Sequence, residues 1–248
     1  MGMDNVLIVY RDKEFDRVKS VTSVLEKKKI KYKTVDREKL TTISNVDLII
    51  SFGGDGTFLK TASAVMDSTP ILGVDSNPGT RVGFYTRANI NNFKEKLGKK
   101  FRFVSLQRLR ACINGKFIPK LALNEFLITT QEPYHTANYE LEGEKQQSSG
   151  ILIGTGSGST AWIKSAGGKK LPMGSKKFQY VVREPYSGKW KKPKNTKKVL
   201  SNNENVKITS CMKGGIIVAD SSPRSFRFNI GDSVEISVSN KPIQFVEV

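Results

Sequence analysis

Histidine, cysteine and long apolar runs are scarce in this chain. His135 is the only histidine among 248 residues, which nearly excludes an imidazole-based catalytic triad and a multi-histidine metal site. We interpret His135 as structural or exposed. Cys112 and Cys211 are the only cysteines; two thiols do not make a disulfide framework, so we predict that both are reduced and buried. No apolar run approaches the length of a membrane span.

The N-terminal residues do not have the pattern of a signal peptide. They run directly into residues 5–10, an apolar segment typical of a β-strand. The sequence therefore predicts a cytoplasmic protein with no membrane partner.

Acidic residues are also few relative to basic ones. Lys and Arg number 41 against 23 Asp and Glu, which gives a formal net charge of +18 and a pI near 9.8. Such a bias suits a polyanionic partner, and nucleotide phosphates, polyphosphate and nucleic acid all qualify. Much of the excess lies in the lysine-rich stretches 96–100 and 189–198. We interpret these as solvated faces and loops, so a nucleic-acid partner is not favoured.

A glycine-rich turn dominates the first part of the chain. Residues 46–50 are apolar enough for a buried strand, residues 58–66 predict a helix, and Gly53, Gly54 and Gly56 lie between them. Such a turn is either a plain tight turn or an anion site in which backbone amides at the helix start face phosphate oxygens. Asp55 would repel a phosphate unless it accepts a hydroxyl proton or holds a metal ion.

The first hundred residues alternate between strand and helix patterns. This βαβ order predicts a doubly wound α/β domain with a parallel sheet over residues 1–99. A second glycine-rich loop, residues 76–84, leaves the sheet near the first. The expected strands are 5–10, 32–35, 46–50 and 70–75, and the expected helices are 13–28, 58–66 and 90–97.

After residue 100 the chain consists of short strand-like segments with little helix. We therefore predict a β-sandwich-like second domain over residues 100–238. The expected strands are 101–113, 119–129, 139–142, 150–154, 179–183, 206–211, 216–219, 225–228 and 232–238.

Two polar motifs interrupt this β-rich part. Asn124 and Glu125 lie inside the apolar run 121–128, where burial requires partners for both side chains. These partners are either protein groups or a nucleotide, whose base the amide would read and whose ribose the carboxylate would grip. Residues 150–168 then form a third glycine-rich loop with a short helical turn at Trp162, whose indole suits a base or a sugar. Glycine and serine also occur in linkers, but the apolar flanks argue against one.

The three motifs occur in one order, 53–57, then 124–125, then 155–168, and in this order they resemble the NAD kinase family over nearly the whole chain. Diacylglycerol- and sphingosine-type lipid kinases share only the first motif. The resemblance implies transfer of the γ-phosphoryl of ATP, or of polyphosphate, to the 2′-hydroxyl of the adenosine ribose of NAD(H). It also implies Mg²⁺ that arrives with ATP, a homo-oligomer (dimer or tetramer), and C-terminal residues, about 239–248, that return to the first domain.

The resemblance also assigns roles by position. Asp55 would be the general base, and Lys60 would neutralise phosphate charge. The remaining residues fall into two groups. The group expected to bind ATP phosphates is Gly53, Gly54, Gly56 and Thr57. The group expected to bind NAD is Asn124, Glu125, Thr160, Ala161, Trp162 and Ser165.

The chain departs from the family pattern in places. Ser149 stands where most members have Asp, Trp162 replaces the usual Tyr, and the segment between Gly73 and Gly83 is longer than in bacterial members. These features resemble the mitochondrial-type branch. The competing hypotheses are a lipid kinase, a non-catalytic NAD sensor, and a nucleic-acid-binding module that rests only on the net charge.

Overall fold

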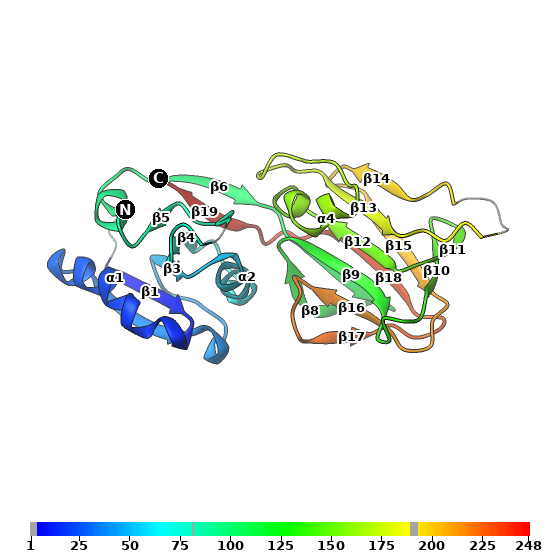
Figure 1. Ribbon diagram of the computed structural model, residues 1–248, viewed down its shortest axis with the longest axis horizontal. Coiled ribbons are helices and arrows are strands. Elements are labelled where there is room, and N and C mark those ends of the chain that lie inside the picture. Colours follow the sequence, from blue (N-terminus) through cyan, green and yellow to red (C-terminus); the bar gives the residue numbers. More distant parts are fainter. Residues whose placement is uncertain (1–3, 81, 189–192) are drawn as a thin grey trace. The chain divides into compact units, whose positions relative to one another are not determined.

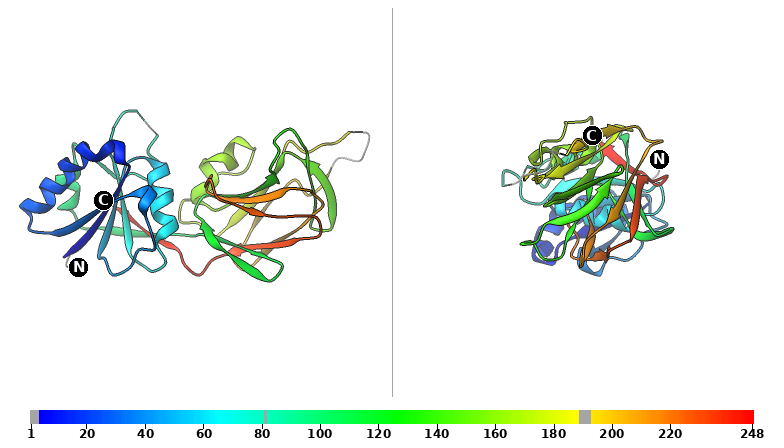
Figure 2. Two further views of the ribbon diagram at one scale, coloured as in Figure 1. Left: turned by 90° about the horizontal axis from the view of Figure 1, so that it is seen from below. Right: turned by 90° about the vertical axis from the view of Figure 1, so that its right-hand side faces the viewer.

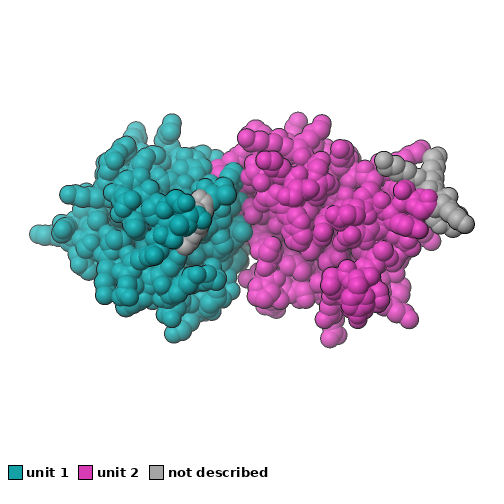
Figure 3. Space-filling model, in the orientation of Figure 1, with its two compact units in different colours: residues 1–105, 241–248 teal, residues 106–240 magenta. Residues whose placement is uncertain are grey.

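The chain folds into two compact units. The computed structural model describes residues 4–80, 82–188 and 193–248, so residues 189–192 of the predicted lysine-rich loop lie outside the described part. The first unit comprises residues 1–105 and 241–248, and the second comprises residues 106–240 (Figure 3). The sequence predicts the boundary after residue 99. The structure divides later because β6 (Arg102–Leu106) completes the sheet of the first unit.

The first unit is built on a seven-stranded sheet with the order β2-β1-β3-β4-β19-β6, and β5 also pairs with β4. The strands β1 to β4 and β19 pair in parallel. The C-terminal strand β19 lies beside β4 in this sheet, as Figures 1 and 2 show. The strand bounds are β1 Asn5–Tyr10, β2 Lys31–Asp36, β3 Leu48–Phe52, β4 Pro70–Asp75, β5 Ala88–Asn89 and β19 Ile243–Glu247.

Helices cover both faces of this sheet. Val18, Val21 and Leu25 recur at helical spacing in α1 (Phe15–Lys27) and are buried against one face, together with α3 (Phe93–Leu97). The helix α2 (Asp55–Ala64) packs on the other face, where Phe58 stacks on Tyr85 with ring centroids 4.6 Å apart. Two short 3₁₀ helices, η1 (Asp12–Glu14) and η2 (Arg37–Lys39), follow β1 and β2.

The second unit contains two six-stranded antiparallel sheets with one hydrophobic core between them. Their orders are β11-β10-β15-β18-β7-β8 and β14-β13-β12-β9-β16-β17. The strands of the first sheet are β7 Leu109–Ile113, β8 Lys116–Ala122, β10 Ala137–Leu141, β11 Glu144–Ser148, β15 Asn205–Ser210 and β18 Ser233–Val238. Those of the second are β9 Glu125–Thr130, β12 Gly150–Gly154, β13 Phe178–Arg183, β14 Lys197–Leu200, β16 Gly215–Ala219 and β17 Ser225–Arg227.

The predicted fold class, a parallel α/β domain followed by a β-sandwich-like domain, is confirmed. Two predicted strands are wrong because each spans a change of sheet. Residues 101–113 divide into β6 and β7, and residues 119–129 divide into β8 and β9. The helix predicted at 58–66 begins earlier, at Asp55, and the one predicted at 90–97 begins later, at Phe93. The polar strands β11 and β14 were not predicted.

The cysteine prediction needs one correction. Both thiols are free, but Cys211, which directly follows β15, is exposed, and Cys112, next to the last residue of β7, is only partly buried. His135 is exposed and pairs with Glu132, as expected for a residue outside any site. No helix in the described part of the chain is both long enough and apolar enough to cross a membrane.

The return of β19 generates a stability prediction. Phe245 is fully buried. The centre of its ring lies 5.5 Å from that of Phe58 and 6.3 Å from that of Tyr85, and the guanidinium carbon of Arg87 lies 4.6 Å from it. Phe245→Ala should lower the free energy of unfolding of the first unit by about 3–5 kcal/mol, as measured by urea denaturation. Phe103→Ala is the control, because that ring is 47% exposed. Equal losses in the two variants would contradict a core role for β19.

Candidate functional site

The glycine-rich turn of the first unit lies at the carboxyl end of β3. Gly53 has φ +151°, and a Cβ there would come within 2.5 Å of the Thr57 hydroxyl and 3.2 Å of Glu14 Oε2. A side chain at this position is therefore both strained and obstructed. The turn delivers the chain directly into α2, which starts at Asp55. This places the predicted anion site at the start of a helix and at the ligand-binding edge of a parallel sheet.

Backbone amides of the second glycine-rich loop hold the Asp55 carboxylate. Oδ1 accepts a hydrogen bond from the amide of Tyr85 at 2.8 Å, and Oδ2 accepts one from the amide of Phe84 at 3.1 Å. The Tyr85 ring is fully buried between Phe58 and Phe245, so its backbone is fixed. Each carboxylate oxygen can accept a further hydrogen bond. Asp55 is thus oriented and can still accept a hydrogen bond from a hydroxyl group.

A close backbone contact lets this loop reach Asp55. A Cβ at Gly73 would lie 1.9 Å from the Tyr85 carbonyl oxygen, so the loop can cross β4 only over a glycine. The Arg87 amide donates to the Gly73 carbonyl at 2.9 Å and fixes the crossing. The predicted second glycine-rich loop therefore belongs to the site through its main chain.

The predicted phosphate-binding residues in the first turn of α2 differ in which of their polar groups are already hydrogen-bonded. The Thr57 amide donates to the Gly54 carbonyl at 2.9 Å, so this amide is already used inside the turn. The Thr57 hydroxyl accepts from Arg37 Nη1 at 3.4 Å, and a Cβ at Gly56 would lie 3.8 Å from the same nitrogen. Arg37 therefore places a cation over the turn.

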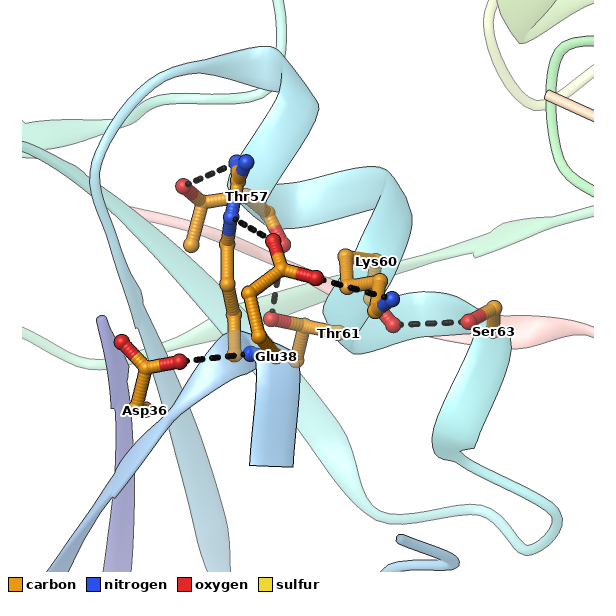
Figure 4. Close-up of polar contacts among 7 residues, drawn as sticks. Asp36, Glu38, Thr57, Lys60, Thr61 and Ser63 are labelled. Carbon is orange, nitrogen blue, oxygen red and sulfur yellow. Dashed lines mark hydrogen bonds and ion pairs between the residues drawn. The ribbon is translucent and has the colours of Figure 1, made fainter. Parts of the chain in front are cut away.

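Lys60 is engaged with an acid (Figure 4). Its ammonium lies 3.3 Å from Glu38 Oε2, while Arg37 Nε lies 2.9 Å from Glu38 Oε1. The hydrogen bond and charge of Lys60 lower the pKa of Glu38, with a smaller effect from Arg37. The Glu38 amide donates to Asp36 Oδ1 at 2.7 Å, which fixes the start of η2. Nothing in the sequence pattern singled out Arg37 and Glu38, although both follow β2 at the same sheet edge as the glycine turn.

The second unit brings two predicted motifs together. The chain leaves β8 at Ala122 and enters β9 at Glu125, so Asn124 lies between two strands and not inside one. The Leu123 carbonyl accepts from the hydroxyls of Thr155 and Ser157 at 2.6 and 3.1 Å. The Asn124 carbonyl accepts from the Thr155 amide at 2.9 Å. The Asn-Glu pair and the third glycine-rich loop therefore form one site.

The third glycine-rich loop comes closest to the Asn-Glu segment at Gly158. A Cβ there would lie 2.2 Å from the Asn124 carbonyl oxygen, closer than any side chain tolerates. Glycine at this position is what allows η3 (Ser157–Thr160) to pack against the backbone of Asn124.

The remaining predicted dinucleotide-binding residues follow directly. Thr160 ends η3, Ala161 connects it to α4 (Trp162–Ser165), and Ser165 ends α4 and is exposed. The Trp162 ring is 36% exposed, and the guanidinium carbon of Arg183 lies 4.9 Å from its centre. The indole therefore covers Arg183, a contact that the sequence did not reveal.

A buried charged cluster underlies Glu125. Asp220 follows β16, is partly buried, and accepts hydrogen bonds from the amides of Leu123, Asn124 and Glu125 at 2.7, 2.7 and 3.2 Å. Burial raises the pKa of Asp220 to about 6, although the three amides oppose the shift. Burial and then the charge of Asp220 raise the pKa of Glu125 to about 8. Arg108 is also fully buried; desolvation lowers its pKa to about 10.

Little in the sequence indicates this cluster. Asp220 follows an apolar strand and precedes Ser221 and Ser222, which is typical of an ordinary turn. Its partners are 95 to 97 residues away along the chain. The sequence therefore shows only that Asp220 is an acidic residue directly after an apolar strand.

The raised pKa of Glu125 predicts a pH dependence. The folded protein binds this proton more tightly than the unfolded chain, so the contribution to stability is complete below pH 4.5 and is lost as the pH rises towards 8. Between about pH 5 and 8 the free energy of unfolding should fall by about 3–4 kcal/mol because of Glu125. Glu125→Gln should remove this part, as measured by urea denaturation without dinucleotide. Identical pH profiles in both proteins would contradict the assignment.

Comparison with known proteins identifies both parts of the chain. The model of the ATP-NAD kinase N-terminal domain matches residues 4–102, and that of the ATP-NAD kinase C-terminal domain matches residues 123–248. A probable NADH kinase of Oryza sativa subsp. japonica is 30% identical over 89% of this chain and 77% of its own length. An NAD kinase of Methanosarcina barkeri is 28% identical over 82% of this chain and 74% of its own length.

Solved structures share the fold. An NAD kinase from Archaeoglobus fulgidus, solved in complex with ATP, has a TM-score of 0.77 and 23% identity, covering 97% of this chain and 92% of that one. Yeast NADH kinase complexed with NADH has a TM-score of 0.82 and 17% identity, covering 100% and 84%. With the two family models spanning nearly all of the sequence, these matches show that the chain belongs to the NAD kinase family, a family of phosphotransferases.

Proposed function

We propose that this chain transfers the γ-phosphoryl of ATP, or a phosphoryl of polyphosphate, to the 2′-hydroxyl of the adenosine ribose of NAD or NADH. The observation that carries the proposal is the Asp55 carboxylate, oriented by the amides of Phe84 and Tyr85 at the start of α2. A hydroxyl acceptor needs a base, and a transferred phosphoryl needs donors and cations. The residues around this turn supply both.

In the proposed reaction, the 2′-hydroxyl gives its proton to Asp55 as its oxygen bonds to the γ-phosphorus. The bond between that phosphorus and the β–γ bridging oxygen breaks, and ADP leaves with the bonding electrons. Asn124 and Glu125 bind the adenosine, with Thr160, Ala161, Trp162 and Ser165 around it. The protein acts mainly through positioning and charge stabilisation, since phosphoryl transfer requires little else.

The donor's phosphates are assigned to the turn Gly53, Gly54, Gly56 and Thr57 and to Lys60, and Arg37 adds a second cation. The amides of Gly53 and Thr57 donate to the carbonyls of Val74 and Gly54, so Gly53 shapes the turn and Thr57 would act through its hydroxyl. No group of three or more His, Cys, Asp or Glu side chains in residues 4–80, 82–188 and 193–248 could hold a metal ion. Mg²⁺ is expected to arrive with ATP, bound through the phosphate oxygens and water, so that Asp55 stays available as the base. The cytoplasmic location and the homo-oligomer stay predictions.

The choice between NAD and NADH rests on relatives of both kinds. The rice and Arabidopsis thaliana proteins are named as NADH kinases and the archaeal ones as NAD kinases. We propose that both dinucleotides are substrates. A lipid kinase, an NAD sensor and a nucleic-acid module are not favoured, because both halves of the chain match the same kinase family.

The central test is NADP(H) formation by Asp55→Asn. The amide keeps the shape of the side chain but cannot take the proton, so kcat should fall by about 10²–10⁴-fold while NADH binding, followed by its fluorescence, is retained. The assay uses NAD or NADH with ATP and Mg²⁺, and is repeated with polyphosphate. Asp67→Asn, beyond the end of α2, is the matched control. Full turnover by Asp55→Asn would refute the base assignment.

A second test concerns the cations of the donor site. Glu38 competes with phosphate for Lys60 and Arg37, and exposed ion pairs contribute about 0.2–1 kcal/mol. Glu38→Gln should therefore lower the KM for ATP by about two- to fivefold, with a smaller effect at high salt. Glu95→Gln, which removes a similar exposed pair with Lys99, should leave this KM unchanged. An unchanged or raised KM in Glu38→Gln would contradict a donor role for these cations.

A further inference from the structure

The segment between β8 and β9 is held by a residue far away in the sequence. At residues 123–125 the chain passes from one sheet of the second unit to the other. Three successive amides, those of Leu123, Asn124 and Glu125, donate to the Asp220 carboxylate. Oδ2 accepts from Leu123, and Oδ1 accepts from the other two. A carboxylate that accepts three amides fixes the path of the backbone more firmly than a single hydrogen bond would.

Asp220 is itself fixed. Its backbone has φ +48°, which turns the chain sharply after β16 and brings the carboxylate back towards β9. Its own amide donates to the Glu125 carbonyl at 3.0 Å, so residues 125 and 220 are bonded in both directions. The positive charge of the buried Arg108 acts on the same carboxylate.

The same segment, residues 123–125, also binds the third glycine-rich loop. The Leu123 and Asn124 carbonyls accept from Thr155 and Ser157, and the backbone of Asn124 packs on Gly158. A shift of this segment would therefore move both the Asn-Glu side chains and the loop that faces them.

We propose that Asp220 is a positioning residue for dinucleotide binding. It acts through the backbone of residues 123–125 and sets where the side chains of Asn124 and Glu125 meet the adenosine. This rests on the proposed function, because it takes Asn124 and Glu125 as ligand-binding groups. Asp220 does not touch the substrate in this account.

The test replaces the acceptor without changing its shape. In Asp220→Asn the amide nitrogen faces a backbone N–H, so one hydrogen bond is lost and the segment shifts. The Kd for NADH, measured by its fluorescence, should rise about 10- to 100-fold, and the KM for NAD should rise with it. Asp232→Asn is the control, since that partly exposed carboxylate also accepts a backbone amide, that of Asn229, at 2.7 Å. Its Kd should equal that of the wild type.

A purely structural role would give a different result. If Asp220 only stabilises the fold, Asp220→Asn lowers the amplitude of NADH binding and the melting temperature but leaves Kd and KM unchanged, and the proposal is overturned. Asn124→Ala separates this from the proposed function. If Asn124→Ala raises Kd and Asp220→Asn does not, only the positioning role fails; if Asn124→Ala leaves Kd and turnover unchanged, the dinucleotide site itself is wrong.

A measurement on the unaltered protein covers the case in which Asp220→Asn does not fold. Residue-resolved hydrogen exchange should show strong protection at the amides of Leu123, Asn124 and Glu125. Exchange at the rate of unprotected backbone would overturn the proposal, because the clamp would then not hold in solution.

Discussion

Hydrogen bonds between an aspartate carboxylate and backbone amides organise both units. In the first, the amides of Phe84 and Tyr85 hold Asp55 at the start of α2. In the second, Asp220 holds the amides of residues 123–125. The two units differ in which partner of these hydrogen bonds orients the other. In the first unit a loop orients the side chain of Asp55, and in the second the partly buried side chain of Asp220 orients the loop at residues 123–125. Such charge-assisted hydrogen bonds are short and directional, so they suit groups that must not drift.

Both arrangements depend on glycines that let main chain touch main chain. The Tyr85 carbonyl lies over Gly73, and the Asn124 carbonyl lies against Gly158; at either position a Cβ would come within about 2 Å of an oxygen. Gly73 lies in β4 and Gly158 in η3, so neither glycine serves to form a turn. Their function is to leave space, which explains why glycine-rich stretches recur at each part of the site.

Much of this was predictable from local pattern. A buried strand, a glycine turn and a helix in succession located Asp55 at a sheet edge, and the fold class followed from the alternation of periods before residue 100 and its loss afterwards. Asn124 and Glu125 stand out as polar residues in an apolar run, but the run predicts a single strand because hydrophobicity continues across the change of sheet. Asp220, Arg108 and Arg37 could not be found, since their significance lies in partners far away along the chain.

The position of β19 in the sheet affects the order in which the two units can fold. This strand belongs to the sheet of the first unit, between β4 and β6, yet the ribosome makes it after every residue of the second unit. The sheet of the first unit can therefore be completed only after the second unit has been synthesised. Folding of the first unit thus depends on a strand that is separated from the rest of its sheet by the whole of the second unit.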